Sequence, residues 1–149
     1  MDKEAMKLAN QLCFSAYNVS RLFARFYEQQ LKSFGLTYSQ YLVLLALWER
    51  NPQTLHEIGK QLKLSSNTLT PLLKRLETAG WIKREKSSED KRQLIVTLTD
   101  KGIRNQASVY EALANCVPEE MKYEDYQEAK LIMDQLESAL EKQININKG

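Results

Sequence analysis

The most reactive side chain in the first third of the sequence is the thiol of Cys13, within NQLCFSAYNVSRLFARFYEQQ. A thiol is a good nucleophile and a target for oxidation only when hydrogen-bond donors or positive charge stabilise its thiolate. Tyrosine hydroxyls can be such donors, and cations near Cys13 are few. Without them, a lone cysteine on a helix acts as a small apolar core residue. Cys13 is therefore either a chemical sensor or a packing residue.

Cys116 is the other of the two cysteines. Two cysteines do not make a disulfide scaffold, so both are expected to be thiols in a reducing compartment. Cys116 ends a helical pattern just before VPEE, where we expect loose packing and easy access for solvent. It is either reactive or an inert thiol near a helix end.

Other chemistry has little support in the sequence. His56 is the only histidine, which excludes a His-rich zinc site, and a mixed carboxylate site has no supporting pattern. No Gly-rich phosphate loop and no nucleophile–base pair is present. We therefore expect no metal, no cofactor and no enzymatic activity.

Length and composition indicate one globular domain with a real core. The chain has 149 residues, of which 43% are hydrophobic and 27% charged, and its few glycines and prolines favour helix. No apolar run approaches the roughly 20 residues of a membrane span, and MDKEAMKLANQ lacks the apolar core of a signal peptide. We expect a cytoplasmic protein that does not bind membranes.

Positive charge is concentrated in one block, although the net charge is only +2. The cations of this block are Lys74, Arg75, Lys83, Arg84, Lys86, Lys91 and Arg92. Such a block attracts polyanions, including nucleic acids. Acidic residues are interleaved with it, so an ordinary solvated surface is the alternative.

Helical periodicity dominates the first third of the chain. Apolar residues recur at spacings near 3.6, which predicts one long helix from about Lys3 to Lys32, ended near Gly35. Packing against a second chain is the simplest way to bury so long a helix. TYSQYLVLLALWER then predicts a buried core helix with Ser39 as its N-cap.

Two shorter helices follow. In TLHEIGKQLKL, Thr54 and Glu57 have the spacing of a capping box. In SSNTLTPLLKRLETAG, Gly80 is suited to end the helix, and Pro71 is expected to kink it slightly if it falls beyond the first turn. A stripe of leucines predicts the buried face of this helix: Leu69, Leu72, Leu73 and Leu76.

After Gly80 the spacing of the apolar residues changes from a period of 3.6 to a period of 2. WIKRE and QLIVTL predict two short strands joined by the polar loop KSSEDKR. Thr99 should cap a helix over DKGIRNQASVYEALANC, Pro118 interrupts it, and a last amphipathic helix is expected from about Glu119 to Gln143. The fold class is therefore mainly α with a small β-hairpin.

The order of these elements predicts a winged helix-turn-helix with added helices. We expect a single domain over 1–149, in which 37–99 form the DNA-binding lobe. Residues 1–36 and 100–149 should form a helical dimerisation region, because the terminal helices have no partner in so small a motif. The expected partners are double-stranded DNA and a second copy of the chain.

The residues expected to contact DNA lie on the outer face of the second short helix and on the hairpin. Hydroxyl and amide groups can bond phosphates or base edges, and cations attract phosphate. At the hairpin tip, Arg92 can enter the minor groove and Asp90 can hold the loop in shape. The full set is Ser65, Ser66, Asn67, Thr68, Thr70, Pro71, Lys74, Arg75, Lys86, Asp90, Lys91 and Arg92. The alternatives are an amphipathic surface helix and a solvated turn with a weak ion pair.

Four segments resemble the MarR family of bacterial winged-helix regulators: QLCFSAYNVSR, LTYSQYLVLLALWE, TLTPLLKRLE and SSEDKRQLIVTLTDKG. More narrowly, they resemble its peroxide-sensing branch, the organic-hydroperoxide regulators and their staphylococcal virulence and biofilm relatives. The resemblance extends over nearly the whole chain and weakens toward the C-terminus. It implies a homodimer that binds a pseudo-palindromic promoter operator, usually as a repressor.

The same resemblance implies roles for individual residues. It places the family's reactive cysteine on Cys13 and its thiolate-bonding tyrosines on Tyr27 and Tyr38, with Tyr17 near the site. It also places the recognition helix on Ser66–Glu77 and the wing arginine on Arg92 beside Asp90.

The family includes two kinds of peroxide sensor. Members with one reactive cysteine form mixed disulfides with small thiols, whereas members with two pair them across the dimer. The resemblance implies that Cys116 lies where such a second cysteine could sit.

Helix geometry bears on the tyrosine assignment. Cys13 and Tyr27 are 14 residues apart, which places them within about 40° on one helix face but about 21 Å apart along the axis. They cannot touch within one straight helix. If Tyr27 bonds the sulfur, it must come from the other subunit.

The hypothesis is a transcriptional regulator that senses peroxide through Cys13 and then releases DNA, by way of an intersubunit disulfide between Cys13 and Cys116. Two alternatives stay open. One is a regulator of the same fold that binds a small aromatic ligand non-covalently, in which Cys13 is incidental. The other is a helical protein–protein adaptor without DNA binding.

Overall fold

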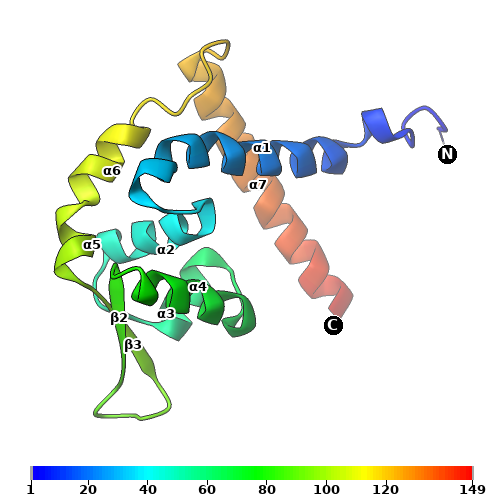
Figure 1. Cartoon of the computed structure of the whole chain (residues 1–149). Helices are drawn as coiled ribbons and strands as arrows, with labels where there is room; N and C mark the ends of the chain where they lie inside the picture. The colour runs from blue at the N-terminus through cyan, green and yellow to red at the C-terminus, as the bar shows by residue number, and fades with distance from the viewer. Residues whose placement is uncertain (1, 149) are drawn as a thin grey trace. The chain divides into compact units, whose positions relative to one another are not determined.

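The computed structural model describes residues 2–148, and it divides into two compact units with the boundary between Ala114 and Asn115. Both units are shown in Figure 1. The first holds α1 (Leu12–Leu31), α2 (Tyr38–Glu49), α3 (Leu55–Leu62), α4 (Ser66–Thr78), α5 (Asp100–Arg104) and α6 (Gln106–Leu113). It also holds the short 3-10 helices η1 (Leu8–Asn10) and η2 (Lys32–Phe34) and the strands β1 (Gln53–Thr54), β2 (Ile82–Lys86) and β3 (Leu94–Leu98). The second unit holds α7 (Tyr123–Lys148).

The predicted long N-terminal helix begins at Leu12, so the expected start near Lys3 was wrong. Side-chain amides explain the difference, because they bond backbone carbonyls and compete with helical hydrogen bonds. Gln11 Nε2 donates to the carbonyl of Ala5 at 2.6 Å, and Asn10 Nδ2 donates to that of Glu4 at 2.7 Å. The shorter helix places Cys13 in its first turn.

The next two helices are each opened by a capping box. For α3 the predicted pair is confirmed, with Thr54 N–H donating to Glu57 Oε1 at 3.0 Å and Glu57 N–H donating to Thr54 Oγ1 at 3.1 Å. For α2 the N-cap is Thr37, so Ser39 was wrong. Thr37 has the extended backbone of an N-cap and exchanges both box hydrogen bonds with Gln40, three residues on.

Helix α4 has the predicted buried stripe, since its four leucines are all buried. Pro71 lies beyond the first turn, where its missing N–H leaves the carbonyl of Asn67 without a helical donor, and the helix continues to Thr78. Gly80 follows with φ +87°, a left-handed conformation that favours glycine, as its predicted role requires. The stripe fixes the opposite face of α4 toward solvent.

The two predicted strands form an antiparallel hairpin, paired from Ile82↔Leu98 to Lys86↔Leu94. A third strand, β1, was not predicted and pairs with β3, giving the order β1–β3–β2. Two residues are too short a strand to show a period of 2. The sheet's Ile82 and Val96 are buried with the leucines of α2 and α4, so the hairpin is rooted in the core.

The C-terminal helices differ from the expected bounds. The single helix expected to run to Cys116 is two, α5 and α6, and it ends at Leu113. The break falls at Asn105, whose Nδ2 donates to the carbonyl of Lys101 at 2.8 Å. The last helix begins at Tyr123, not Glu119, and runs to Lys148. Among the described residues, no helix has the length and apolar character needed to span a membrane.

Candidate nucleic-acid interface and thiol site

The outer face of α4 is exposed, as predicted. Its exposed residues are Ser65, Ser66, Asn67, Thr68, Thr70, Pro71, Lys74 and Arg75. Two of them are already engaged, because Ser65 is the N-cap of the helix and its Oγ accepts the N–H of Thr68 at 3.3 Å. The hydroxyls of Ser65 and Thr68 also bond each other at 3.1 Å. These short side chains are held in place at the start of the helix.

The hairpin, which we call the wing (residues 82–98), carries an exposed arginine on an ordered loop. The side chain of Arg92 is 91% exposed. Asp90 Oδ1 accepts the backbone N–H of Arg92 at 3.0 Å and its Nε–H at 3.2 Å. The side-chain and backbone bonds from Arg92 hold the pKa of Asp90 below its ordinary value. Lys86 and Lys91 are exposed beside them.

Ser87 also orders the loop, and sequence reasoning missed it. It is buried, and its Oγ accepts the N–H of Glu89 at 3.2 Å and of Asp90 at 3.3 Å. Its own N–H donates to the carbonyl of Gln93 at 2.9 Å, which closes the loop. A serine followed by polar turn residues is the signal that could have found it.

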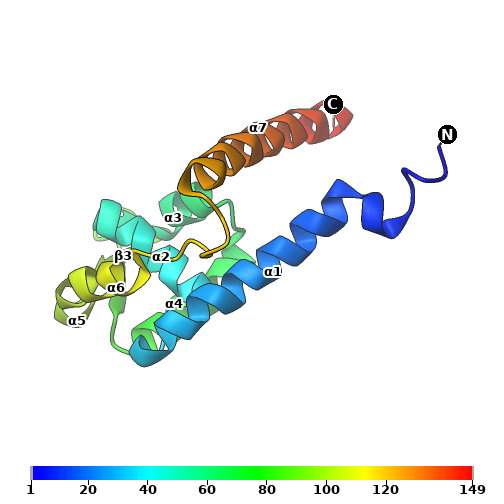
Figure 2. The ribbon, with the colours of Figure 1, turned by 90° about the horizontal axis from the view of Figure 1, so that it is seen from above.

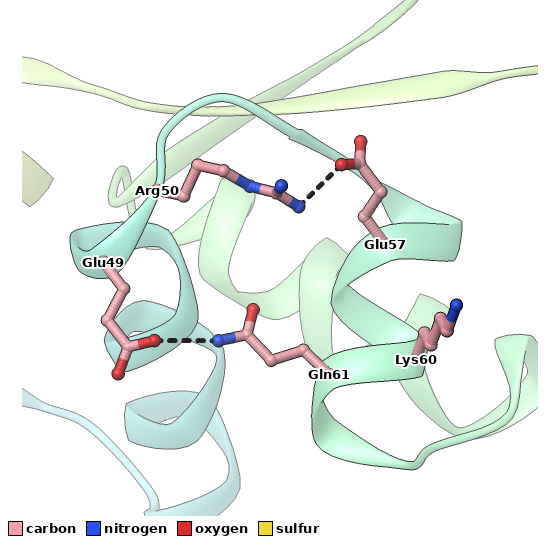
Figure 3. Close-up of a pocket in the computed structure, with 5 residues that line it drawn as sticks. All are labelled: Glu49, Arg50, Glu57, Lys60 and Gln61. Carbon is pink, nitrogen blue, oxygen red and sulfur yellow. Dashed lines mark hydrogen bonds and ion pairs between the residues drawn. The ribbon is translucent and has the colours of Figure 1, made fainter.

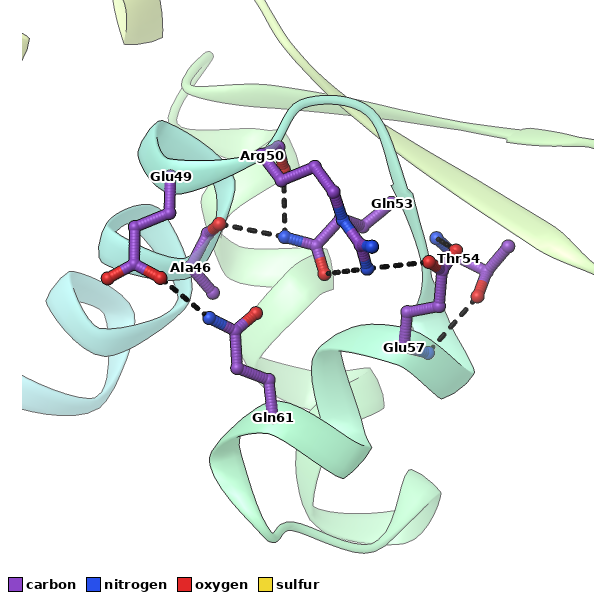
Figure 4. A network of polar contacts seen from close by, with 7 residues as sticks. All are labelled: Ala46, Glu49, Arg50, Gln53, Thr54, Glu57 and Gln61. Carbon is purple, nitrogen blue, oxygen red and sulfur yellow. Dashed lines mark hydrogen bonds and ion pairs between the residues drawn. The ribbon is translucent and has the colours of Figure 1, made fainter.

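A polar network joins the end of α2 to the start of α3 (Figure 4). Buried Gln53 donates from Nε2 to the carbonyls of Ala46 at 2.7 Å and Arg50 at 2.8 Å. Glu57 accepts from Arg50 Nη2 at 2.6 Å through the oxygen that Thr54 does not use. The hydrogen bonds from Thr54, and then the charge of Arg50, hold the pKa of Glu57 below its ordinary value.

An open hollow of about 570 Å³ lies beside this network, as Figure 3 shows. Its lining residues are Glu49, Arg50, Glu57, Lys60 and Gln61. Both of its carboxylates are paired, since Glu49 accepts from Gln61 Nε2 at 2.9 Å and Glu57 accepts from Arg50. The arrangement is suited to holding α3 at a fixed angle to α2.

Cys13 is exposed in the first turn of α1. Its Sγ lies 4.0 Å from Gln11 Oε1. One turn further on, Tyr17 is exposed with the guanidinium of Arg21 4.8 Å from its ring centroid.

The other two predicted thiol partners lie together near the opposite end of α1. The ring of Tyr27 is 5.4 Å from that of Tyr38 and 5.9 Å from that of Tyr41, measured between centroids. Cys13 and Tyr27 belong to the same helix, so about 21 Å of helix axis separates them. The structure therefore brings the two tyrosines together, and not Cys13 with Tyr27. Tyr41 was missed, although its spacing of three from Tyr38 is a helical signal.

Cys116 is buried, with 6% of its surface exposed. The expectation of loose packing and easy solvent access was wrong. Burial raises the pKa of its thiol above the ordinary value of 9.0. Within residues 2–148 no group of three or more metal-ligating side chains occurs.

Residues 25–109 match the family described as "Transcriptional regulator SarA/Rot", which is more than half of the chain. The chain belongs to this family of transcriptional regulators. Membership confirms the expectation that it is not an enzyme, and it is at odds with the alternative of an adaptor.

The chain is also 48% identical over 97 residues to the organic hydroperoxide resistance transcriptional regulator of Bacillus subtilis. That match spans 65% of this chain and 66% of the relative, just under two thirds of its length.

Solved structures of other transcriptional regulators have the same fold. The chain is 62% identical to AbfR, a protein of Staphylococcus epidermidis, in a structure of reduced AbfR bound to DNA. That likeness has a TM-score of 0.87 and covers 97% of this chain and 99% of AbfR. Disulfide-formed AbfR, at the same identity and 96% coverage of both chains, matches with a TM-score of 0.66. MarR of E. coli, at 22% identity, shares the fold (TM-score 0.66, covering 85% of this chain and 96% of MarR).

Proposed function

We propose that the chain is a homodimeric regulator, usually a repressor in this family, that binds promoter DNA and releases it when peroxide oxidises Cys13. The observation that carries the proposal is the position of Cys13, exposed in the first turn of α1 and distant from Tyr27 of its own helix. AbfR, at 62% identity, has a solved structure of its reduced form bound to DNA and another of its disulfide form, which supports the same pair of states here.

DNA recognition is assigned to the lobe formed by residues 37–99. Helix α4 would enter the major groove with its polar outer face, held from behind by the leucine stripe. Arg92 would reach the minor groove from a loop fixed by Asp90 and Ser87. Two such lobes about one helical turn apart would read a pseudo-palindromic operator.

Dimerisation is assigned to residues 1–36 and 100–149, because large apolar side chains are exposed along both terminal helices. They are Leu12, Tyr17, Val19 and Leu22 of α1, and Leu131, Ile132, Met133, Leu140, Ile144 and Ile146 of α7. Within the first unit, the N-terminal half of α1 extends beyond α2 and α6 (Figure 2). Groups of exposed apolar side chains of this kind mark protein–protein contacts, and a second copy of the chain supplies the same groups.

The sensing chemistry begins at Cys13. Its thiolate, held by Tyr27 and Tyr38 of the partner, attacks the peroxide O–O bond and takes one oxygen as sulfenic acid, and an alcohol or water leaves. The thiol of Cys116 in the partner then attacks the sulfenic sulfur, water leaves and a disulfide forms. A disulfide needs Cα atoms within about 7 Å, so closing it can pull helices together and change the spacing of the two lobes.

The burial of Cys116 constrains the second step. Its raised pKa leaves less thiolate at neutral pH, and a buried sulfur has to be exposed before it can attack. We therefore expect sulfenic acid at Cys13 to form faster than the disulfide, and disulfide closure to accelerate as pH rises toward 9 and above. A small external thiol competing for the sulfenic acid would give the one-cysteine mechanism instead.

Cysteine variants test the proposal. DNA retention is measured on a duplex that the protein selects from a random-sequence pool, before and after brief peroxide treatment, and non-reducing gels follow covalent dimers. Cys13→Ser should bind DNA with peroxide present and form no covalent dimer. Cys116→Ser, the matched control, should still form sulfenic acid at Cys13 but no covalent dimer.

Two results would redirect the proposal. If Cys13→Ser still released DNA on mild oxidation, Cys13 would not be the sensor and would serve only in packing. Binding by the unmodified protein that is indifferent to peroxide but weakened by small aromatic compounds would favour the ligand-sensing alternative.

A further inference from the structure

The last turn of α4 and the middle of β2 are joined by a pair that the DNA-contact assignments do not use. Arg84 directs its guanidinium at Glu77 Oε1, with Nη2 at 3.0 Å and Nε at 3.3 Å. The backbone N–H of Arg84 donates to the other oxygen, Glu77 Oε2, at 2.9 Å. Both carboxylate oxygens are therefore occupied, and the three bonds fix the direction as well as the distance between helix and strand.

The exposure of Arg84 separates it from the cations expected to meet phosphate. Its side chain is 19% exposed, against 91% for Arg92 at the wing tip. A guanidinium that is mostly buried and forked onto a carboxylate is directed into the protein. Glu77, for its part, is a negative charge at the end of a helix that would face DNA, and the bonds from Arg84 hold its pKa below the ordinary value. Neither group is placed to bind DNA directly.

The Glu77–Arg84 pair lies where it can hold the outer part of the wing. β2 is an edge strand of the sheet, and the Glu77 carboxylate pairs the N–H of Arg84 at that edge. The root of the wing is held separately, by Thr99 Oγ1 donating to the carbonyl of Gly80 at 2.5 Å and by Lys101 Nζ donating to that of Ala79 at 2.8 Å. Figure 1 shows the hairpin extending away from the helices beyond its root. Glu77–Arg84 holds it further out than the root contacts do.

We propose that Glu77 and Arg84 are positioning residues that fix the angle of the wing to the recognition helix α4, so that Arg92 reaches the minor groove while α4 lies in the major groove. The proposal rests on the proposed function, in which α4 and Arg92 both meet DNA. It assigns to this pair the geometry between the two contacts, and to neither residue a contact of its own.

Two substitutions break the pair in different ways. Glu77→Gln keeps the shape but replaces one of the two acceptor oxygens with an NH2 donor, so either the backbone N–H or the guanidinium of Arg84 loses its acceptor. Arg84→Lys keeps the charge and the backbone bond but loses the planar fork. Glu85→Gln is the matched control, because it makes the same chemical change as Glu77→Gln at a carboxylate of β2, next to Arg84, that does not belong to the pair. Its side chain is 67% exposed and is paired with Lys83 Nζ at 3.3 Å.

The first measurement is amide hydrogen exchange over residues 82–93 in the protein without DNA, with thermal unfolding to show that each variant is folded. Glu77→Gln and Arg84→Lys should lose protection in this segment while the leucine stripe of α4 keeps it. Glu85→Gln should resemble the unmodified protein. Unchanged protection in both variants, or an equal loss in Glu85→Gln, overturns the proposal.

The second measurement is affinity for pool-selected duplexes that differ only in A·T-rich or G·C-rich flanks. Loss of the negative charge alone would strengthen DNA binding, so Glu85→Gln should bind as well as or better than the unmodified protein. We expect Arg92→Ala to lose flank discrimination, because Arg92 would no longer reach the minor groove. Glu77→Gln should lose it too, and the double variant Glu77→Gln/Arg92→Ala should lose no more than Arg92→Ala alone. Additive losses contradict the proposal.

The two measurements separate failure of the proposal from failure of the proposed function. If Arg92→Ala leaves affinity and flank discrimination unchanged, the assignment of Arg92 to DNA is wrong. The pair is then judged on wing protection alone, where loss supports its positioning role and no change overturns it.

Discussion

The lobe that would read DNA and the region that would sense peroxide differ in how complete each is within one chain. In the lobe, Arg92 is hydrogen-bonded to Asp90, two residues away, and Ser65 is hydrogen-bonded to Thr68, three residues away. In the thiol region, Cys13 and the pair Tyr27–Tyr38 lie toward opposite ends of α1. Short-range hydrogen bonds can complete a reading surface inside one subunit, whereas the proposed sensing site would need a second chain to bring Cys13 and the tyrosines together.

The largest expected effect concerns the support of the reading helix. Leu73→Ala removes a side chain with 0% exposure from the α4 stripe, and the lost burial plus the cavity should lower the free energy of unfolding by about 2–5 kcal/mol. Urea unfolding measures the change. Thr70→Ala, on the exposed face of the same helix, is the control and should change stability by no more than about 0.5 kcal/mol. Equal losses in the two variants would mean that the stripe does not support α4.

The next effect tests the dependence of the thiol region on a second chain. Leu140→Glu places a charge on the face of α7 that carries the exposed Met133 and Ile144, and should shift the protein from dimer to monomer, because burying an unpaired charge is costly. Sedimentation equilibrium over a range of concentrations measures the shift. Asn145→Glu adds the same charge to the face of the helix that carries Asp134 and Glu141, and should leave the dimer intact. A Leu140→Glu variant that stays dimeric at the lowest concentrations would place the interface elsewhere.

A smaller effect is expected from a single DNA contact. Arg92→Ala should weaken DNA binding, and each lost phosphate contact should reduce the log–log salt slope by roughly 0.9 per subunit. Fluorescence anisotropy on the pool-selected duplex at several salt concentrations gives both values. Lys130→Ala removes the same charge from α7, where Lys130 pairs with Asp134, and should leave the slope unchanged. An unaltered slope in Arg92→Ala would reduce the wing to a surface turn.

The smallest effect concerns pH. The pKa of Glu57 is lowered in the folded state from 4.5, so its contribution to stability is fully present above about pH 4.5 and is lost as pH falls through the lowered pKa. Glu57→Gln should therefore be less stable than the unmodified protein at pH 7, and the difference should close in acid. Urea unfolding at pH 7 and at a pH well below 4.5 measures this difference. Glu119→Gln is the control, because Glu119 is exposed. A difference that persists undiminished in acid would contradict the assignment.

The sequence was a good guide to features that neighbours along the chain complete. The leucine stripe, the Thr54–Glu57 box, the Thr99 cap and the Gly80 end were all visible as local patterns. The start of α1 was not, because amide side chains of Asn10 and Gln11 reach back six residues to non-helical carbonyls. The burial of Cys116 was missed for a related reason, since burial depends on packing that periodicity does not report.

The candidate sites also differ in whether a local sequence pattern could reveal them. The exposed face of α4 and the Asp90–Arg92 pair were read from spacing and residue type. Glu77–Arg84 was missed, because a cation inside a basic block gives no sign that it points inward. Only the three-dimensional path from α4 through Gly80 into β2 shows that the two residues, seven apart, meet.

The most direct test of a sensing site shared between chains uses mixed dimers with one Cys13 each, purified through two different tags, with Cys116→Ser in both chains to preserve the sulfenic acid. In one arrangement Cys13→Ser and Tyr27→Phe are in the same chain, so the remaining Cys13 faces the partner's Phe at position 27. In the other they are in opposite chains, so it faces an intact Tyr27 across the dimer. Trapping of the sulfenic acid after brief peroxide treatment should show fast oxidation in the opposite-chain dimer and slow oxidation in the same-chain dimer. The reverse order would place Tyr27 beside the cysteine of its own chain and contradict the account.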